Sequence, residues 1–268
     1  MFNKMDDKVL FCGQGAGVMA VECDTGIFRA FEEWGTIPGK ALTSSGSTLF
    51  SSLYYSGHNI DWMHCLIDNV KLNKFFTLSP FGAIETLAGK ARHILNNDGV
   101  KELLEKYMTG KASLRVQTSI TRMEDYTTHF VDVTPATALA ATSIPYIFKP
   151  VKIGNDLFVD GGVLNNIPVP KYEEIDNWKH VFIYLSPAAD YRDLKDPLII
   201  ELFDLLQAIM DREVQQLAEI GYFSHPKVTV IRPESSFGGN LLAWSPGLKL
   251  EQRCYEITKE ALKNVQID

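Results

Sequence analysis

The sequence predicts one α/β domain over residues 1–268, with a largely parallel central sheet between two layers of helices. Short apolar runs that end in glycine or polar turns alternate with longer amphipathic segments along the chain. This alternation is typical of parallel sheets, whose strands are connected by helices. No repeat, low-complexity tract or linker divides the chain, and 46% of its residues are hydrophobic. We therefore expect a single three-layer α/β/α fold with a substantial core.

The first quarter of the chain contains two strand–loop–helix units. Val9–Cys12 is an apolar run that stops at a glycine-rich loop, as a buried strand does. Ile27–Trp34 has apolar residues on one helical face and charged residues on the other, so it is predicted to be a helix. Ala41–Ser44 is the second expected strand, and Thr48–Tyr55 is the helix after its serine-rich turn. Asn59–Val70 is expected to form a further helix.

The middle of the chain is less regular. Lys71–Leu95 is rich in apolar residues, and two interpretations remain open: a pair of helices packed on the core, or a cap that faces an acyl chain, in particular Phe75–Leu87. Glu102–Met108 is predicted to be helical. Ser113–Arg122 and Thr128–Val133 alternate apolar and polar residues and are expected to be neighbouring strands.

The remaining elements complete the alternation. Thr134 and Pro135 form a good helix start, because a hydroxyl can cap the helix and proline suits its first turn. The helix Ala136–Thr142 consists of small residues. Phe158–Val159 is expected to be a strand that leads to Asp160, and Val181–Leu185 a fully buried strand. The last predicted elements are the helix Leu198–Ile220, the strand Val228–Ile231 and the helix Leu248–Val265.

Composition and charge limit the classes of partner. The net charge of −7 argues against nucleic acid as the main ligand and against strong attraction to anionic lipid. Peripheral membrane contact through apolar surface is still compatible with it. The four cysteines are scattered and match no zinc pattern, so reduced thiols are expected. With no apolar leader and no run long enough to span a bilayer, the sequence predicts a soluble cytoplasmic protein.

Two turns and one carboxylate together suggest acyl-transfer chemistry. Ser44 follows a strand and precedes a helix, which is the layout of a nucleophile elbow. Gly13–Gly17 offers uncovered backbone N–H groups that could stabilise an oxyanion. Asp160, followed by two glycines, ends a strand, where open α/β sheets place their sites. The sequence thus predicts a serine acyl hydrolase with Ser44 as nucleophile and Asp160 as its general base.

Histidine does not fit this arrangement. None of the six histidines lies in a recognisable motif, and His180, which precedes a strand, is the best candidate for a triad member. A Ser–Asp pair without histidine is therefore the preferred arrangement.

These residues resemble the patatin-like phospholipases. That family has a glycine-rich loop after its first strand, a G-x-S-x-G elbow after its second, and a D-G-G or D-G-A segment with the dyad aspartate. This chain has CGQGAG, then LTSSG, then VDGGVLNNIPVP, in the same order, and the resemblance covers roughly residues 8–187. It implies hydrolysis of acyl esters in phospholipids or related lipids by a phospholipase A or lysophospholipase, without a metal or other cofactor.

The resemblance assigns roles residue by residue. Ser44 is matched to the nucleophile and Asp160 to the base. The oxyanion loop is matched to Gly13, Gln14, Gly15, Ala16 and Gly17. The residues expected to support the elbow and the aspartate loop are Ser45, Gly46, Gly161 and Gly162. In this alignment Leu42 stands where the family has the first glycine of the elbow.

Three other interpretations compete with this one. A dinucleotide-binding enzyme is disfavoured because Val18 stands at the third glycine position of G-x-G-x-x-G. A transacylase normally pairs its elbow serine with a histidine, and none is apparent. The third alternative is an inactive patatin-fold protein that binds lipid or a partner. The sequence does not specify the head group, the acyl position or the oligomeric state.

Overall fold

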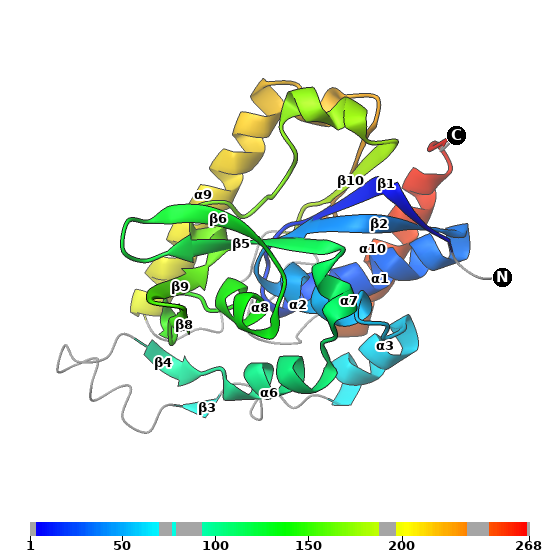
Figure 1. Ribbon diagram of the computed structural model, residues 1–268. Coiled ribbons are helices and arrows are strands. Elements are labelled where there is room, and N and C mark those ends of the chain that lie inside the picture. The colour runs from blue at the N-terminus through cyan, green and yellow to red at the C-terminus, as the bar shows by residue number, and fades with distance from the viewer. Residues whose placement is uncertain (1–3, 70–76, 79–92, 188–196, 235–246, 267–268) are drawn as a thin grey trace.

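The computed structural model describes residues 4–69, 77–78, 93–187, 197–234 and 247–266. Within these residues the chain forms an α/β fold with a mixed, mostly parallel sheet flanked by helices, as expected (Figure 1). Five strands run parallel in the order β11-β10-β1-β2-β5. Their bounds are β1 Lys4–Gly13, β2 Thr36–Thr43, β5 Val116–Arg122, β10 His180–Tyr184 and β11 Val228–Ile231.

Three antiparallel strands extend the sheet beyond β5. They are β6 Thr127–Asp132, β8 Val151–Ile153 and β9 Asp156–Asp160. Both β6 and β9 pair with β5, and β8 pairs with β9. A small separate sheet joins β3 Thr77–Leu78, β4 His93–Asn96 and β7 Tyr146–Phe148.

The central strands are buried on both faces, and alternate residues serve two different cores. Val9 and Phe11 of β1 face one cluster, whereas Leu10 and Cys12 face the other. The first cluster lies under α1 Val18–Trp34, α2 Ser45–Tyr54, α3 Ile60–Asn69 and α10 Gly247–Leu262. The second lies under α9 Pro197–Glu219 and the short helices η2 Tyr172–Asn177 and η3 Tyr222–Ser224. This period of two produces the three layers.

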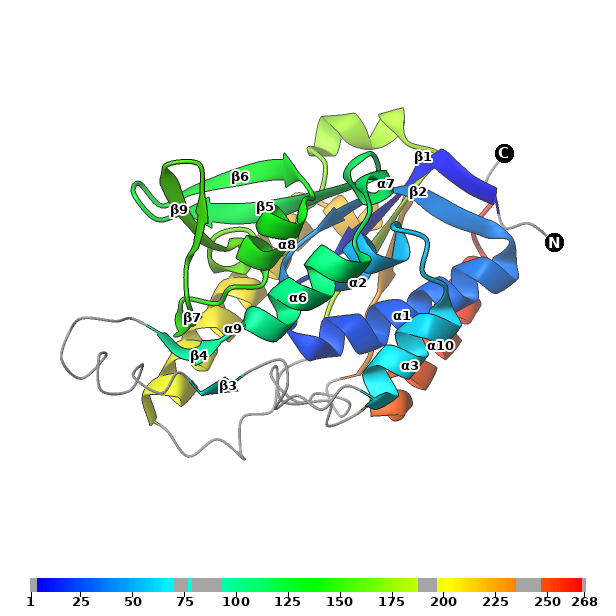
Figure 2. The same ribbon diagram turned by 60° about the horizontal axis from the view of Figure 1, so that its bottom comes forward.

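The remaining helices are α6 Asp98–Tyr107, α7 Gly110–Ser113 and α8 Pro135–Ala141, with η1 Gly161–Val163 after β9. α6 packs with α8 beside the elbow helix α2 (Figure 2). None of the described helices combines the length and the apolar character that a bilayer span requires.

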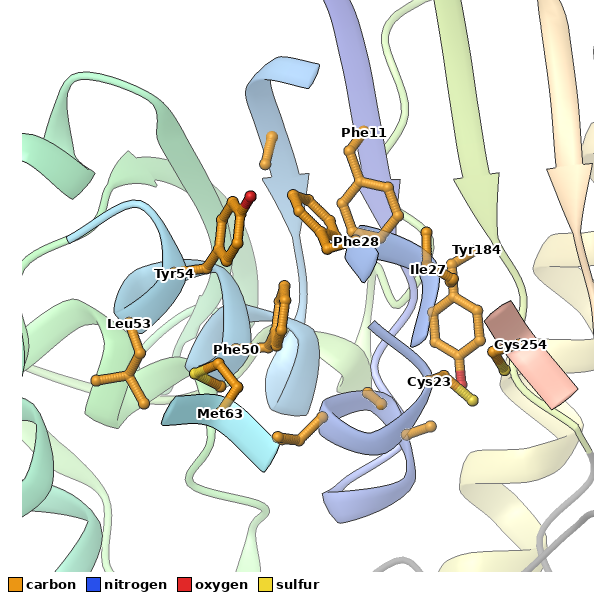
Figure 3. Packing of buried hydrophobic residues seen from close by; sticks show 14 of the residues in the cluster. Phe11, Cys23, Ile27, Phe28, Phe50, Leu53, Tyr54, Met63, Tyr184 and Cys254 are labelled. Atoms are coloured by element: carbon orange, nitrogen blue, oxygen red, sulfur yellow. The ribbon is translucent and has the colours of Figure 1, made fainter. Parts of the chain in front are cut away.

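Phe28 ties α1 to the elements that hold the elbow. The centroid of its ring lies 5.0 Å from the ring centroid of Phe11 in β1. The ring centroids of Phe50 and Tyr54 in α2 lie 5.0 Å and 4.7 Å away (Figure 3). Edge-to-face packing of buried aromatic rings adds stability beyond the area that they bury. This cluster therefore fixes α1 and α2 relative to the sheet, and with them the two loops that precede these helices.

Two predicted elements differ from the observed ones. α1 starts at Val18, nine residues before the predicted helix, because Val18–Ile27 is buried all round and shows no amphipathic pattern. The strand predicted from Ser113 starts at Val116, since α7 occupies the residues before it. Apart from β3 and the start of β4, Lys71–Leu95 lies outside the described residues, and Phe75–Leu87 is described only at Thr77 and Leu78, so the choice between a cap and packed helices is not tested.

We expect Gly26→Ala to loosen the contact between α1 and α10. A Cβ at residue 26 would lie 2.1 Å from the carbonyl oxygen of Glu251, so the backbone of α10 must move. The clash should outweigh the better helix propensity of alanine and lower the free energy of unfolding by about 1–3 kcal/mol. Urea denaturation measures this loss. Gly110→Ala is the control, because a Cβ there meets no atom within 4 Å, and it should not destabilise the protein.

Candidate active site

The sheet brings the ends of β2 and β9 together along one edge of β5. β6 pairs with residues 117–122 of β5 and so takes one edge. On the opposite edge, β2 pairs with residues 116–118 and β9 with residues 120–122. β2 is parallel to β5 and β9 antiparallel, so their carboxyl ends meet beside Ser119. This arrangement places the turn after β2 against Asp160, the last residue of β9.

The turn after β2 has the backbone of a nucleophile elbow centred on Ser45. Ser44 is extended, with φ −130° and ψ 149°, and its N–H donates to the carbonyl oxygen of Gly13 over 3.1 Å. Ser45 follows with φ 49° and is the first residue of α2. Positive φ is strained for serine, and such strain is typical of a side chain held at the sharp turn between a strand and a helix.

The side chain of Ser45 is hydrogen-bonded to Asp160. Its hydroxyl donates to Oδ2 over 2.6 Å, and the N–H of Gly162 donates to Oδ1 over 2.8 Å. Asp160 is only 3% exposed. Burial raises the pKa of Asp160 to about 7, although both hydrogen bonds oppose that rise. A carboxylate with this pKa and geometry can exchange a proton with the serine near neutral pH.

The expected pairing of Ser44 with Asp160 is not found. The Ser44 hydroxyl is fully buried and bonds no other described group. Ser45, expected only as a supporting residue, occupies the position predicted for Ser44. The elbow is therefore Thr43-Ser44-Ser45-Gly46-Ser47, one residue later than predicted. Leu42 is not part of it, and the glycine positions of the family pattern hold Thr43 and Ser47.

The two side chains at these glycine positions are accommodated by buried hydrogen bonds. The Thr43 hydroxyl is paired with that of Thr48 at 3.0 Å. Ser47 donates to the buried Asp24 of α1 over 2.6 Å. Burial raises the pKa of Asp24 well above its ordinary range, and the Ser47 hydrogen bond opposes that shift. Both side chains are thus bonded to buried partners and not to the Ser45 hydroxyl.

Gly46 has no room for a side chain, because the glycine loop lies directly against it. A Cβ at Gly46 would be 1.8 Å from the carbonyl oxygen of Gly17. Gly17 itself has φ 55° and ψ −136°, a conformation that needs glycine. The N-termini of α1 and α2 therefore converge at this contact, and their dipoles favour negative charge beside Ser45.

The predicted oxyanion loop divides into two parts. Gly13 ends β1, and Gln14 is a structural residue whose side-chain oxygen accepts from the N–H of Ser186. Gly15, Ala16 and Gly17 line a cavity of about 30 Å³ together with Ser45 and Asp160. Neither Ala16 nor Gly17 donates its N–H to another described residue. Both residues line the cavity, so their N–H groups are candidates to bind a negative oxygen atom there.

Gly161 and Gly162 directly follow Asp160 and make close contacts around it. A Cβ at Gly161 would lie 2.2 Å from the carbonyl oxygen of Ser119, so this glycine lets the loop cross β5. Gly162 supplies the N–H bond to Asp160 described above.

A second cavity, of about 40 Å³, also includes Ser45. Its lining is mostly apolar and comes from α1, α2, α6, the segment between α8 and β7, and β7 itself. The lining side chains are those of Val18, Val21, Leu49, Val100, Ile144 and Phe148. The apolar lining suits an alkyl group held beside Ser45.

Two further residues at the site were not predicted. Asn166 lies in the N-x-P segment after Asp160 and is bonded to Gly15, whereas Glu213 is bonded to Asn166 from α9. The N-x-P pattern marked the segment but not the role of its asparagine. Burial raises the pKa of Glu213 to about 7, and the N–H groups of Asn166 and Ile167 oppose this. No local signal could identify Glu213, which is one acidic residue among several on an amphipathic helix.

His180 does not belong to this site. It is the first residue of β10, paired with Val9, whereas the site lies beyond the opposite end of that strand. Its Nε2 is paired with the hydroxyl of Thr229 at 2.8 Å.

Comparison with known proteins shows the family of the chain and supports its fold. A family model described as patatin-like phospholipase matches residues 25–171, more than half of the chain. The chain therefore belongs to the patatin-like phospholipase family. The matched part contains the elbow and the Asp160 loop, but it begins within α1, after the glycine loop.

A solved structure supports the same fold. The crystal structure of VipD from Legionella pneumophila aligns with a TM-score of 0.54 and 13% sequence identity. The alignment covers 97% of this chain and 67% of VipD. No curated protein sequence gives a significant match to the chain.

We expect Asp160→Asn to stabilise the fold at alkaline pH. The pKa of Asp160 is raised on folding, so the folded state is favoured at low pH and loses stability as pH rises from about 4 to about 7. Asparagine abolishes this loss and can still bond Ser45 and Gly162. At pH 8 the free energy of unfolding of Asp160→Asn should exceed that of the wild type by up to roughly 4 kcal/mol, at about 1.4 kcal/mol per pKa unit. This difference should vanish near pH 4. Urea denaturation at pH 4, 6 and 8 measures it, and a gain independent of pH would contradict it.

Proposed function

We propose that the protein is a lipid acyl hydrolase of the phospholipase A or lysophospholipase type, with Ser45 as nucleophile and Asp160 as general base. One observation carries the proposal: the hydroxyl at the strained elbow donates to the buried carboxylate over 2.6 Å, beside the glycine loop. Membership of the patatin-like phospholipase family supports lipid esters as the substrate class.

Acylation uses the two residues in turn. Ser45 Oγ attacks the ester carbonyl carbon while its proton passes to Asp160 Oδ2. The resulting oxyanion is stabilised by the N–H groups of Ala16 and Gly17 and by the two helix N-termini. Asp160 then gives the proton to the alcohol oxygen as the ester bond breaks. The alcohol that leaves is the lysophospholipid, or the glycerophosphodiester when the substrate is a lysophospholipid, and the acyl group stays on Ser45.

Deacylation repeats the sequence with water. Asp160 takes a proton from a water molecule, whose oxygen attacks the acyl carbon and forms a second oxyanion in the same position. When the bond to Ser45 breaks, Asp160 returns the proton to Ser45 Oγ and the fatty acid leaves. Every proton transfer is assigned to Asp160, so the proposal requires no metal ion.

The apolar cavity beside Ser45 supports a fatty acyl substrate. Its walls provide alkyl surface without charge, which suits the hydrocarbon of the acyl group rather than its head group. The ester group can then occupy the other side of Ser45, which is lined by the glycine loop and Asp160.

Replacement of the two neighbouring serines separates the candidates for the nucleophile. Ser45→Ala should lower kcat by at least about 10³-fold on phospholipid vesicles and on a soluble p-nitrophenyl ester. Ser44→Ala should retain most activity, because its hydroxyl is buried and touches neither Asp160 nor the cavity. Fatty acid release and labelling by a fluorophosphonate probe measure both.

The opposite outcome, loss of activity in Ser44→Ala with activity retained in Ser45→Ala, would overturn the assignment. Folded wild-type protein that neither reacts with the probe nor releases fatty acid would instead favour a lipid-binding protein without turnover.

The activity should depend on pH through Asp160. The carboxylate accepts the proton of Ser45, so only its ionised form is active. Because the pKa of Asp160 is about 7, kcat/KM for a soluble ester should rise roughly tenfold per unit below pH 7 and level off above it. A profile that stays flat between pH 5 and 8 would contradict the role of Asp160 as base.

A further inference from the structure

Glu213 reaches from α9 to the backbone of the aspartate loop. Both of its carboxylate oxygens lie 3.0 Å from the N–H of Asn166, and the N–H of Ile167 also bonds the carboxylate. Hydrogen bonds to an ionised acceptor are stronger than those between neutral groups. One side chain thus fixes two consecutive backbone groups just after the loop that carries Asp160.

Asn166 connects this point to the glycine loop. Its carbonyl oxygen accepts from the N–H of Gly15 over 3.2 Å, and its side-chain Nδ2 donates to the carbonyl oxygen of Gly15 over 2.9 Å. Asn166 is 3% exposed, so both bonds are shielded from water. Gly15 directly precedes Ala16 and Gly17, whose N–H groups donate to no other described residue, and its Cα lies against Ser45.

α9 is also a wall of the reaction cavity. Leu206 and Met210 line it, and Glu213 follows at the spacing of the same helical face. The helix therefore contacts the space in which the substrate reacts and, one turn later, the bond network that holds the glycine loop. No other described side chain accepts a hydrogen bond from the N–H of Asn166.

We propose that Glu213 is a positioning residue for acyl hydrolysis: through Asn166 it holds the oxyanion loop at the correct distance from Ser45. The inference rests on the function proposed above. Glu213 touches neither the ester nor Ser45, and it acts on the transition state through the position of Ala16 and Gly17.

The role predicts which substitutions impair the reaction. Glutamine at 213 has one acceptor oxygen, and its NH₂ group faces a backbone N–H that can only donate. A shift of the loop by about 1 Å is enough to cost roughly 10²-fold in rate. Because the loop stabilises the oxyanion and not the ground state, kcat should fall while KM for the ester changes little.

The test compares Glu213→Gln with Glu201→Gln. Glu201 lies on the same helix, is exposed and loses the same charge, so it is the matched control. Both variants and Ser45→Ala are assayed at pH 8.5 on a soluble p-nitrophenyl ester, with binding of a trifluoromethyl ketone that forms an oxyanion on the serine. Glu213→Gln should lower kcat and ketone affinity by about 10- to 100-fold, and Glu201→Gln should change neither.

Two further measurements separate positioning from loss of folding. The assays are made at least 20 °C below the melting temperature of each variant, and binding of a free fatty acid should be unchanged in Glu213→Gln. Asn166→Ala should also reduce ketone affinity, and the double variant should lose less than the sum of the two, because both changes act on Gly15.

The outcomes distinguish the two proposals. If the wild type hydrolyses the ester, Ser45→Ala does not, and Glu213→Gln equals Glu201→Gln in kcat and ketone affinity, the positioning role is overturned and the hydrolase stands. An equal loss of fatty acid and ketone binding in folded Glu213→Gln also overturns it, since the helix then acts only as a wall. No hydrolysis by the wild type would instead overturn the proposed function.

Discussion

The site depends on β2 and β9 sharing one edge of β5. Because β2 runs parallel to β5 and β9 antiparallel, the two strands point toward each other, and their pairing with β5 brings their carboxyl ends together. The serine and the aspartate are separated by 115 positions in the chain, but neither depends on a flexible loop for its place. The sheet supplies the geometry, and the elbow needs only to turn Ser45 toward Asp160.

Burial and helix orientation then set the electrostatics at this junction. Asp160 is removed from water, so its pKa rises to about 7 and the ionised form becomes a stronger base. The N-termini of α1 and α2 favour negative charge on the other side of Ser45. Packing around Phe28 keeps both helices in place, so the aromatic core contributes to the chemistry through position.

The pattern of apolar runs predicts most of the strands and helices. It does not determine which serine lies at the turn of the elbow. Strands at Val9, Ala41 and Val181 were found because buried strands end at polar turns or glycine. The sequence pattern predicts Ser44 at the turn, because Gly46 then fits the last glycine of the motif, whereas the structure has Ser45 at the turn and bonded to Asp160. In the structure Gly46 is needed for its contact with Gly17, and Thr43 and Ser47 flank the serine. The sequence does not identify Glu213, because its partner is a backbone N–H 47 residues away. Such a contact produces no local sequence pattern.

The interlock of Gly46 with Gly17 constrains how the chain can diverge in evolution. Positions 43 and 47 accept hydroxyl side chains because the interior offers each a partner, Thr48 and Asp24. Position 46 cannot take a side chain, because the backbone of the glycine loop fills the space. Substitutions in this turn are therefore tolerated at positions 43 and 47 but not at position 46. A related chain can therefore lack both glycines of the G-x-S-x-G pattern, and not be recognised by that pattern, while its turn stays the same.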